Sequence, residues 1–405
     1  MTQVRTTGQS IVPSTSRLVL QLGAATAARI FLNTARRFAY PFASVLSRGL
    51  GVPLTAVTSL LAANQVTGLL SPLFGPLSDR WGYRIMMLVG LVMLAVGMLL
   101  GGWLGVFWAM LPALFLAGLG KSIFDPALQA YTGEKVPYHR RGLAIGFIEF
   151  SWAGSSLLGI PLMGLLIDRL GWRSPFFVLG GCGLVSAFVL GLLIPQERSR
   201  RNLSRRVNGF RQAWLLLRQE RPALSALAFG FLLSIANDNL FVVYGAWLEE
   251  SFGLSTVALG SAALAIGAAE LLGEGLTASV ADRLGLKRAV IAALTLSTFS
   301  YALLPWASRN LPLALTGLFF TFLTFEFTIV TAFSLFTELL PGARATMMSA
   351  STATTSLGRV IGAVMGGAVW MAGGLVATGF VSAAISGLAL AVIAWGLRDW
   401  RVADR

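Results

Sequence analysis

Cysteine, histidine and charged side chains are all scarce in this chain of 405 residues. Its one cysteine, Cys182, excludes an internal disulfide and a cysteine-rich metal site. Its one histidine, His139, stands beside Arg140 and Arg141 in a basic stretch, which excludes a catalytic triad or zinc site built on several histidines. We therefore expect no enzymatic activity, no metal and no cofactor, although these absences leave chemistry at carboxylates open.

Charged residues make up only 12% of the sequence, against about 25% in an average soluble domain. Hydrophobic residues make up 56%. So few charges cannot form the water-facing shell of a soluble globular protein, and so many apolar residues exclude a disordered chain. The composition indicates a protein whose solvent is a lipid bilayer.

Twelve apolar segments are long enough to cross a membrane core, which needs about 20 residues of α-helix. They are too long and continuous for the strands of a transmembrane barrel, so we expect an all-α membrane protein. No cleavage site follows a short apolar core near the start, so we expect no removable signal peptide. The expected helices are 18–47, 54–75, 85–104, 106–131, 142–167, 175–194, 222–248, 257–281, 287–306, 312–339, 347–372 and 375–397.

The net charge is +14, but most of the 31 basic residues lie in the two termini and in every second loop. This distribution is the positive-inside bias of membrane proteins, not a nucleic-acid-binding surface. It predicts a multi-pass protein of the cell membrane, the inner membrane in a bacterium, with both termini in the cytoplasm.

The longest polar stretch, 195–221, is rich in arginine and divides the helices into two groups of six. We interpret it as an anchor on anionic lipid, with a regulatory site as the alternative. The expected organisation is a cytoplasmic tail (1–16), an N-terminal six-helix bundle (17–194), a basic linker (195–221), a C-terminal six-helix bundle (222–398) and a second cytoplasmic tail (399–405).

Two motifs of the first half return in the second half at nearly the same spacing. An Asp-Arg pair follows the second helix at positions 79–80 and the eighth helix at 282–283, an offset of 203 residues. Glu134 ends the fourth helix and Glu338 ends the tenth, an offset of 204 residues. A duplicated six-helix unit is a transporter architecture.

The stretch from Gly75 to Arg84 has the pattern Gly, three residues, Asp-Arg, one residue, Gly, one residue, Arg. This pattern resembles the signature loop between helices 2 and 3 of the major facilitator superfamily, and the copy after helix 8 is also expected for that family. Gly171-Trp172-Arg173 before helix 6 is similar to another family motif. The resemblance implies two pseudo-symmetric six-helix bundles with a solute site between them, and secondary active transport by alternating access.

The same resemblance implies that the signature loops form a latch between the halves when the inner side closes. The glycines allow tight turns, and the aspartates can cap a neighbouring helix or pair with a basic residue. The alternative is that these charges only set the topology. The expected gating residues are Gly75, Asp79, Arg80, Gly82, Arg84, Glu134, Arg141, Asp282, Arg283, Glu338 and Arg344.

The fifth helix contains a glycine-rich stretch from Gly154 to Gly164. It resembles the Gly/Pro-rich motif of the superfamily's proton-driven exporters, except that Ile160 separates the glycine from the proline. The eleventh helix has glycines at 358, 362 and 366, and small residues at this spacing permit close helix packing. Packing alone is the alternative interpretation of both stretches.

Eleven ionisable residues lie at membrane depth, where charges are costly and usually face a cavity. None lies in helices 3, 6, 9 or 12, so we expect those four helices to face lipid. Asn33 corresponds to Asn237 in the repeat, 204 residues later. The expected substrate-binding residues are Arg29, Asn33, Arg36, Lys121, Asp125, Asn237, Asp238, Glu326 and Arg359.

At this depth the first half has four basic and two acidic groups, and the second half has one basic and four acidic groups. A cavity between the halves would then have one basic wall and one acidic wall. This predicts either salt bridges across the cavity or the binding of a zwitterionic or amphipathic solute. On the first helix, Arg36 continues the face of Arg29 and Asn33. We therefore expect Arg36 in the cavity, and Arg37 either paired with a neighbouring helix or off that face.

A proton carrier must change its charge during the transport cycle, and a carboxylate that gains and loses a basic partner can do so. Among the carboxylates at mid-depth we rank Glu270 first, Asp238 second and Glu326 third, with Glu149 as a further candidate. Arg359 is the expected partner of Glu270.

No ATP-binding motif is present, because the Gly-Lys-Ser triplet at 120–122 lies inside an expected helix. The expected function is proton-coupled export of small amphipathic molecules, similar to the drug-export branch of the superfamily. The alternatives are proton-coupled uptake of an organic anion, a lipid flippase and a membrane sensor that no longer transports. The expected partners are a small-molecule substrate, protons and the bilayer, without nucleic acid, and the expected state is a monomer.

Overall fold

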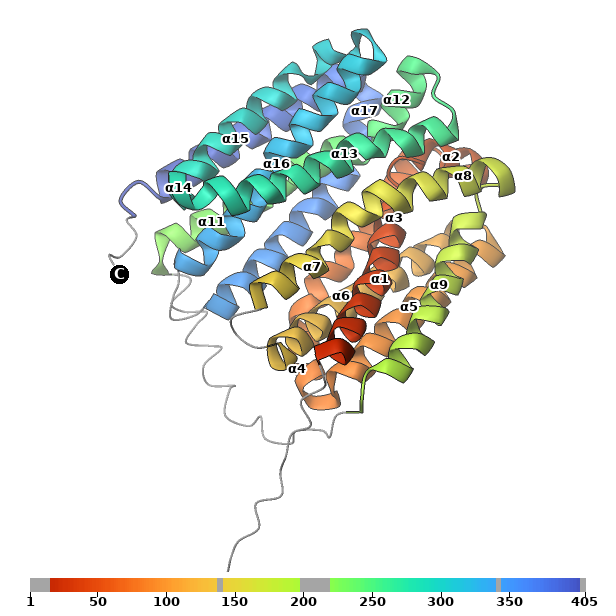
Figure 1. Cartoon of the computed structure of the whole chain (residues 1–405). Helices are drawn as coiled ribbons and strands as arrows, with labels where there is room; N and C mark the ends of the chain where they lie inside the picture. The colour runs from red at the N-terminus through yellow and green to blue at the C-terminus, as the bar shows by residue number, and fades with distance from the viewer. Residues whose placement is uncertain (1–14, 137–140, 197–218, 340–343, 401–405) are drawn as a thin grey trace, which may run out of the picture.

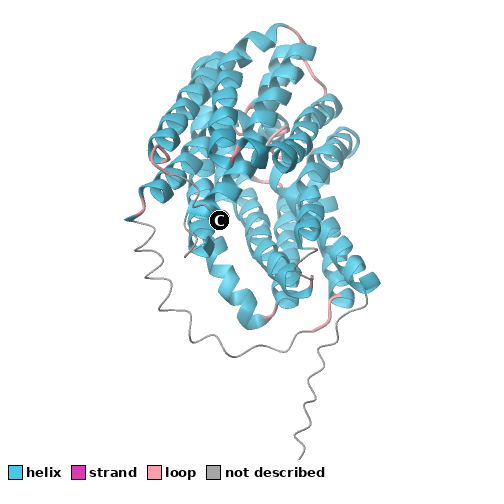
Figure 2. Ribbon diagram, turned by 60° about the vertical axis from the view of Figure 1, so that its left-hand side comes forward, coloured by secondary structure: helices cyan, strands magenta, loops and turns pink. Residues whose placement is uncertain are grey.

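The computed structural model describes residues 15–136, 141–196, 219–339 and 344–400 (Figure 1). Every regular element in these ranges is helical (Figure 2), which confirms the all-α fold. The first half contains α1 (Thr15–Arg37), α2 (Ala43–Leu50), α3 (Leu54–Val66), η1 (Thr67–Leu70), α4 (Ser71–Trp81), α5 (Tyr83–Leu104), α6 (Phe107–Lys135), α7 (Arg141–Gly154), η3 (Ser155–Gly159), α8 (Ile160–Leu170) and α9 (Ser174–Leu193). The second half contains α11 (Arg221–Phe241), α12 (Tyr244–Phe252), α13 (Thr256–Leu276), η4 (Thr277–Ala281), α14 (Asp282–Leu284), α15 (Leu286–Leu303), η5 (Leu304–Arg309), α16 (Leu311–Leu339) and α17 (Arg344–Gly396).

Eleven continuous helical segments of the described ranges are long and apolar enough to cross a membrane. The last of them, Ala350–Gly396, has 47 residues and would span about 70 Å as one helix, more than twice a bilayer core. The backbone leaves the helical conformation at Gly373 and Gly374 inside α17, so α17 supplies two spans. The described chain therefore has the twelve spans that its apolar segments predict.

Two of the expected helices are interrupted in the structure. The segment 18–47 was expected as one helix, but α1 ends at Arg37 and α2 begins at Ala43. Pro41 lies in this break, and proline disfavours a helix interior because its ring clashes and it lacks an N–H group. The segment 222–248 breaks at the equivalent place, between α11 and α12.

Glycines in left-handed or other positive-φ conformations mark the same turns in both halves. This backbone region is strained for residues with a Cβ atom, so the glycines are specific to these turns. They form three pairs separated by 202 or 203 residues: Gly51 and Gly253, Gly82 and Gly285, and Gly171 and Gly374. The duplication seen in the sequence is therefore also present in the backbone.

The two halves lie side by side, with α3 and α8 of the first half packed on α17 and α13 of the second (Figure 1). We call the end of the bundle where α1 and α11 begin the terminus face. We call the end with α2 and α12 the opposite face. Helices α2, α8 and α12 gather at the opposite face in Figure 1.

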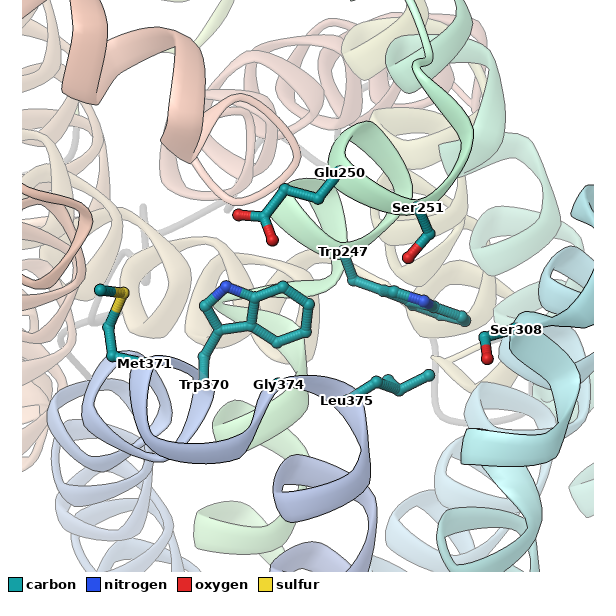
Figure 3. Close-up of a pocket in the computed structure, with 8 residues that line it drawn as sticks. All are labelled: Trp247, Glu250, Ser251, Ser308, Trp370, Met371, Gly374 and Leu375. Atoms are coloured by element: carbon teal, nitrogen blue, oxygen red, sulfur yellow. The ribbon is translucent and has the colours of Figure 1, made fainter.

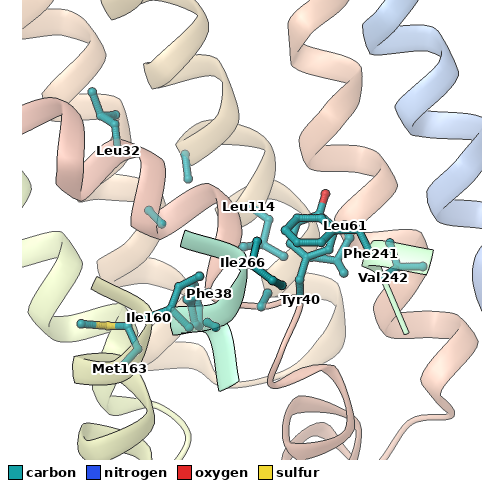
Figure 4. Close-up of a cluster of buried hydrophobic side chains, with 14 of the residues drawn as sticks. Leu32, Phe38, Tyr40, Leu61, Leu114, Ile160, Met163, Phe241, Val242 and Ile266 are labelled. Atoms are coloured by element: carbon teal, nitrogen blue, oxygen red, sulfur yellow. The ribbon is translucent and has the colours of Figure 1, made fainter. Parts of the chain in front are cut away.

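A continuous apolar cluster joins the halves (Figure 4). Tyr40 packs against Phe241 of the second half, with ring centroids 4.4 Å apart. Gly245 of α12 lies against the backbone of Pro41, so no Cβ atom fits there. The cluster closes the interface on the side of the opposite face.

Helices α5, α9 and α15 pack on elements of their own half. They expose large apolar side chains, including Trp103, Phe188 and Phe299. Exposed apolar surface of this extent suits contact with lipid tails. This arrangement agrees with the absence of ionisable residues from helices 3, 6 and 9.

Candidate functional site between the two halves

A cluster of four charged side chains lies inside the first half. Arg29 of α1 is buried, and its Nε lies 3.0 Å from Asp125 Oδ1 of α6. Its Nη1 lies 3.0 Å from Glu149 Oε2 of α7. Lys121 Nζ lies 2.6 Å from Asp125 Oδ2. Two cations and two carboxylates compensate one another, which is the condition for holding charge away from water.

The structure therefore brings together four of the residues that the sequence singled out, from three helices. Asn33 lies beside this cluster and donates a hydrogen bond from Nδ2 to Ser151 Oγ, 3.0 Å away. It is fully buried in this conformation and contributes to the packing of α1 on α7.

Arg37 and Glu270 form an ion pair between the halves. Arg37 Nη1 donates to Glu270 Oε2 at 3.2 Å, and Nη2 donates a second hydrogen bond to Oε1. Ser156, in the π-helical turn η3, donates to Glu270 Oε2 at 2.9 Å. The Arg37 guanidinium also lies 5.1 Å from the ring centroid of Trp152 and 5.5 Å from that of Phe241. π-Helical turns often occur at functional sites, and here η3 positions Ser156 as a hydrogen-bond donor to Glu270.

The expected pairing of Glu270 with Arg359 is wrong. Arg359 Nε lies 3.8 Å from Asp238 Oδ2, and Glu270 binds Arg37 instead. The reason is helix packing. Gly358 and Gly362 bring α17 so close to α11 that Arg359 lies beside Asp238, whereas α13 packs on the other half.

A second polar chain runs across the interface. Arg36 donates to Gln65, Gln65 donates to the Tyr40 hydroxyl, and that hydroxyl donates to Asp238 Oδ1 at 3.4 Å. Arg36 is partly exposed and Asp238 is fully buried. Arg37 is buried off this face, paired with α13. Asn237 of α11 accepts a hydrogen bond from Tyr301 at 3.4 Å.

Glu326 of α16 lies against α13 at Gly273, between the positions of Glu270 and Glu274. A Cβ atom on Gly273 would be only 2.8 Å from Glu326 Cβ. Among the described residues, the salt bridges include neither Glu326 nor Glu274. The wall contributed by the second half therefore has more carboxyl groups than basic side chains to pair with them.

A third connection between the halves lies at the opposite face. Arg48 Nη2 of α2 lies 2.6 Å from Glu249 Oε1 of α12, and Ser44 also donates to Glu249. Sequence reasoning missed this pair. Its traces were a lone arginine before the turn at Gly51 and an acidic pair before the equivalent turn at Gly253.

The expected gating loops are described only in part. Gly82 and Gly285 have φ values of 94° and 80°, as their tight turns require. Arg84 donates to the Gly191 carbonyl of α9, a contact inside the first half. Arg283 and Glu134 are exposed, and Glu338 is partly buried. Gly75 lies in α4, and the side chains of Asp79, Arg80, Arg141, Asp282 and Arg344 lie outside the described part of the structure.

A duplicated bundle of membrane-spanning helices, with a buried ion pair between its halves, is typical of secondary transporters. The chain belongs to the Major Facilitator Superfamily, whose family model matches residues 25–273 and 226–403. This confirms the family resemblance of the sequence, and it makes the protein a multi-pass membrane transporter of small molecules and not an enzyme.

Relatives of this chain include characterised and uncharacterised transporters. The uncharacterized MFS-type transporter YceJ of Bacillus subtilis (strain 168) is 30% identical over 295 residues, which cover 72% of this chain and 74% of YceJ. The multidrug resistance protein MdtG of Citrobacter koseri is 29% identical over 244 residues, 58% of this chain and 60% of MdtG. The crystal structure of a bacterial homolog to the human lysosomal transporter Spinster, inward-facing and unoccupied, has a TM-score of 0.76 at 15% identity, covering 96% of this chain and 100% of that one.

Proposed function

We propose that this transporter exports small amphipathic molecules in exchange for protons, with both termini in the cytoplasm. The terminus face is then cytoplasmic and the opposite face is external. The distribution of basic residues over alternate loops supports the orientation. The similarity to MdtG, which is named as a multidrug resistance protein, supports export of this substrate class.

The observation that carries the coupling proposal is the ion pair between Arg37 and Glu270. The guanidinium and a proton compete for the same carboxylate. When the halves separate at the opposite face, Arg37 withdraws from Glu270 and a proton from outside takes its place. When the halves close there again, Arg37 returns and the proton leaves towards the terminus face. Proton binding is thereby tied to one conformation, as coupling requires.

The charges at the interface favour a cationic or zwitterionic amphipath. Arg29 and Arg37 are already paired with carboxylates, whereas Glu274 and Glu326 stand outside the salt bridges of the described residues. We propose that Glu326, Asp238 and Arg36 contact the substrate. Aromatic rings such as Trp152 and Phe241 contribute apolar surface to the same region.

One observation favours a second function, the uptake of an organic anion. Among the described residues, Arg36 bonds only to the neutral amide of Gln65, so its charge is available to an anionic solute. In this case Arg36 binds the anion and the proton moves in the same direction as the solute.

Flux in proteoliposomes separates the two functions. Ethidium serves as the amphipathic cation and a carboxyfluorescein as the organic anion, each tested under a pH gradient of either sign. Export by exchange predicts ethidium movement opposite to the proton gradient, abolished by a proton ionophore and absent from protein-free liposomes. Anion flux in the direction of the protons establishes the second function instead. An ethidium flux that is the same under both pH gradients contradicts proton coupling.

A further inference from the structure

A cavity of about 480 Å³ opens on the opposite face, entirely within the second half (Figure 3). Its walls come from α12, η5 and α17, and include Trp247, Glu250, Ser308, Trp370 and Gly374. None of these residues belongs to the ion pairs between the halves. Its volume is in the range of small-molecule sites in proteins.

Two indole rings and one carboxylate border the same space (Figure 3). Trp247 and Trp370 are both buried, at 1% and 8% exposure. The Trp247 Nε1 has no hydrogen-bond partner among the described residues. Glu250 is exposed at the mouth, and no salt bridge of the described residues includes it. The indole N–H can donate to an acceptor oxygen of a ligand, and the carboxylate can pair with a positive charge.

This set of side chains suits an organic cation. The face of an indole ring attracts a cationic group within about 6 Å of its centroid, and quaternary ammonium ions are recognised by cages of such rings. A carboxylate at the mouth adds charge complementarity. A small hydrated metal ion would find too few oxygen ligands here, and an anion would meet the carboxylate.

The residues that line the cavity differ from those at the equivalent positions of the first half. The paired glycine turns set the register between the halves. In that register Val45 and Ile167 replace the two indoles, and Arg48 replaces the carboxylate of Glu250. In the same register the first half has Asp168 and Trp172 in place of Met371 and Leu375, so its acid and its aromatic ring stand at other positions of the equivalent surface. The pair of indoles with Glu250 is therefore an arrangement of the second half.

We propose that this cavity, the Trp247–Trp370 site, binds an organic monocation of the quaternary ammonium type. The site lies on α12, whose Glu249 pairs with Arg48 of the other half, so a bound cation lies next to the contact that closes the opposite face. As far as direction is concerned, the inference rests on the proposed function: in an exporter this is a release-side site, outside the central charges.

Binding to the purified full-length chain in detergent tests the proposal, with no gradient and no transport. Isothermal titration uses acetylcholine and its uncharged isostere 3,3-dimethylbutyl acetate as probes. Acetylcholine should bind at least about tenfold more tightly than the isostere, because only the charged probe gains the ring and carboxylate attractions. Equal binding of the two probes overturns the proposal.

Two variants locate the binding. Glu250→Gln removes an exposed charge without altering the packing, and Trp370→Leu removes one ring. Each should weaken acetylcholine binding about fivefold or more. Asp168→Asn, which removes an exposed carboxylate of the first half near the same face, should bind as wild type. Unchanged binding in Glu250→Gln overturns the proposal even if Trp370→Leu fails to fold. The binding assay needs no flux, so its result does not depend on whether transport is coupled to protons. A failure to bind acetylcholine would likewise leave the proposed proton coupling untouched.

Discussion

Arg37 of α1 and Glu270 of α13 lie 233 residues apart in the chain and share two hydrogen bonds across the interface of the halves. Their side chains are only 5% and 8% exposed. A buried charge that loses its partner is costly, so the halves cannot part here unless something replaces the missing partner. A proton on Glu270 is the simplest replacement, and this links the opening of the opposite face to protonation.

Arg37→Ala should destabilise the protein, because it leaves Glu270 buried without its cation. The cost of breaking a buried pair is about 3–5 kcal/mol. Adding Glu270→Gln should restore part of the loss, since it removes the unpaired charge. Thermal unfolding of the purified variants measures both effects, and Arg36→Ala, whose partner is a neutral amide, is the matched control. A double variant no more stable than Arg37→Ala would mean that the pair is not the cause.

Gly245→Ala should open the opposite face. A Cβ atom at position 245 meets the backbone of Pro41 in the other half, which cannot move as a side chain can. The labelling rate of Ser44→Cys by an impermeant maleimide, in a Cys182→Ser background, reports this opening. Gly275→Ala is the control, because a Cβ atom there meets nothing within 4 Å. Equal labelling in the two glycine variants would show that this contact does not hold the face closed.

Gly362→Ala should lower thermal stability. Its Cβ atom would lie 2.7 Å from the Ile235 carbonyl oxygen, where α17 packs on α11. Overpacking of this kind costs about 1–3 kcal/mol. Gly181→Ala on α9, with open space around its Cβ position, should unfold at the wild-type temperature or slightly above it. A loss no larger than that of Gly181→Ala would argue against close packing as the role of this glycine.

Asp79→Asn should cut transport strongly and leave expression and substrate binding nearly intact. The proposal is that Asp79 and Arg80 belong to a latch that closes the terminus face, as the recurrence of the pair at 282–283 suggests. Flux and binding are measured on the same preparation, with Asp168→Asn as a control. Wild-type flux in Asp79→Asn would remove the latch from the account.

The membrane spans and their duplication follow from the sequence because both depend on local properties. An apolar run of about 20 residues is enough to specify a span in lipid. Lys121 and Asp125 are four residues apart in one helix, a spacing that places them on one face, and they form an ion pair. The break at Pro41 was not predicted, because the apolar run continues on both sides of it. The proline itself was a signal for this break.

The partner of Glu270 could not be predicted in the same way. Helical periodicity tells which face of one helix a residue occupies, but not which helix of the other half meets that face. That choice depends on how two bundles pack. Here the glycines of α17 let it pack closely on α11, and this places Arg359 beside Asp238. The Trp247–Trp370 site was missed for the same reason, since its two rings come from helices distant in the chain.

The most direct test of the account is Glu270→Gln, assayed in proteoliposomes for substrate exchange and for pH-driven flux separately. Glutamine keeps the size of the side chain and cannot carry the proton, so the halves still alternate but no longer depend on protonation. The account predicts that exchange of substrate across the membrane is retained while a pH gradient no longer drives net flux. Undiminished pH-driven flux in Glu270→Gln would contradict it and move the proton site to Asp238.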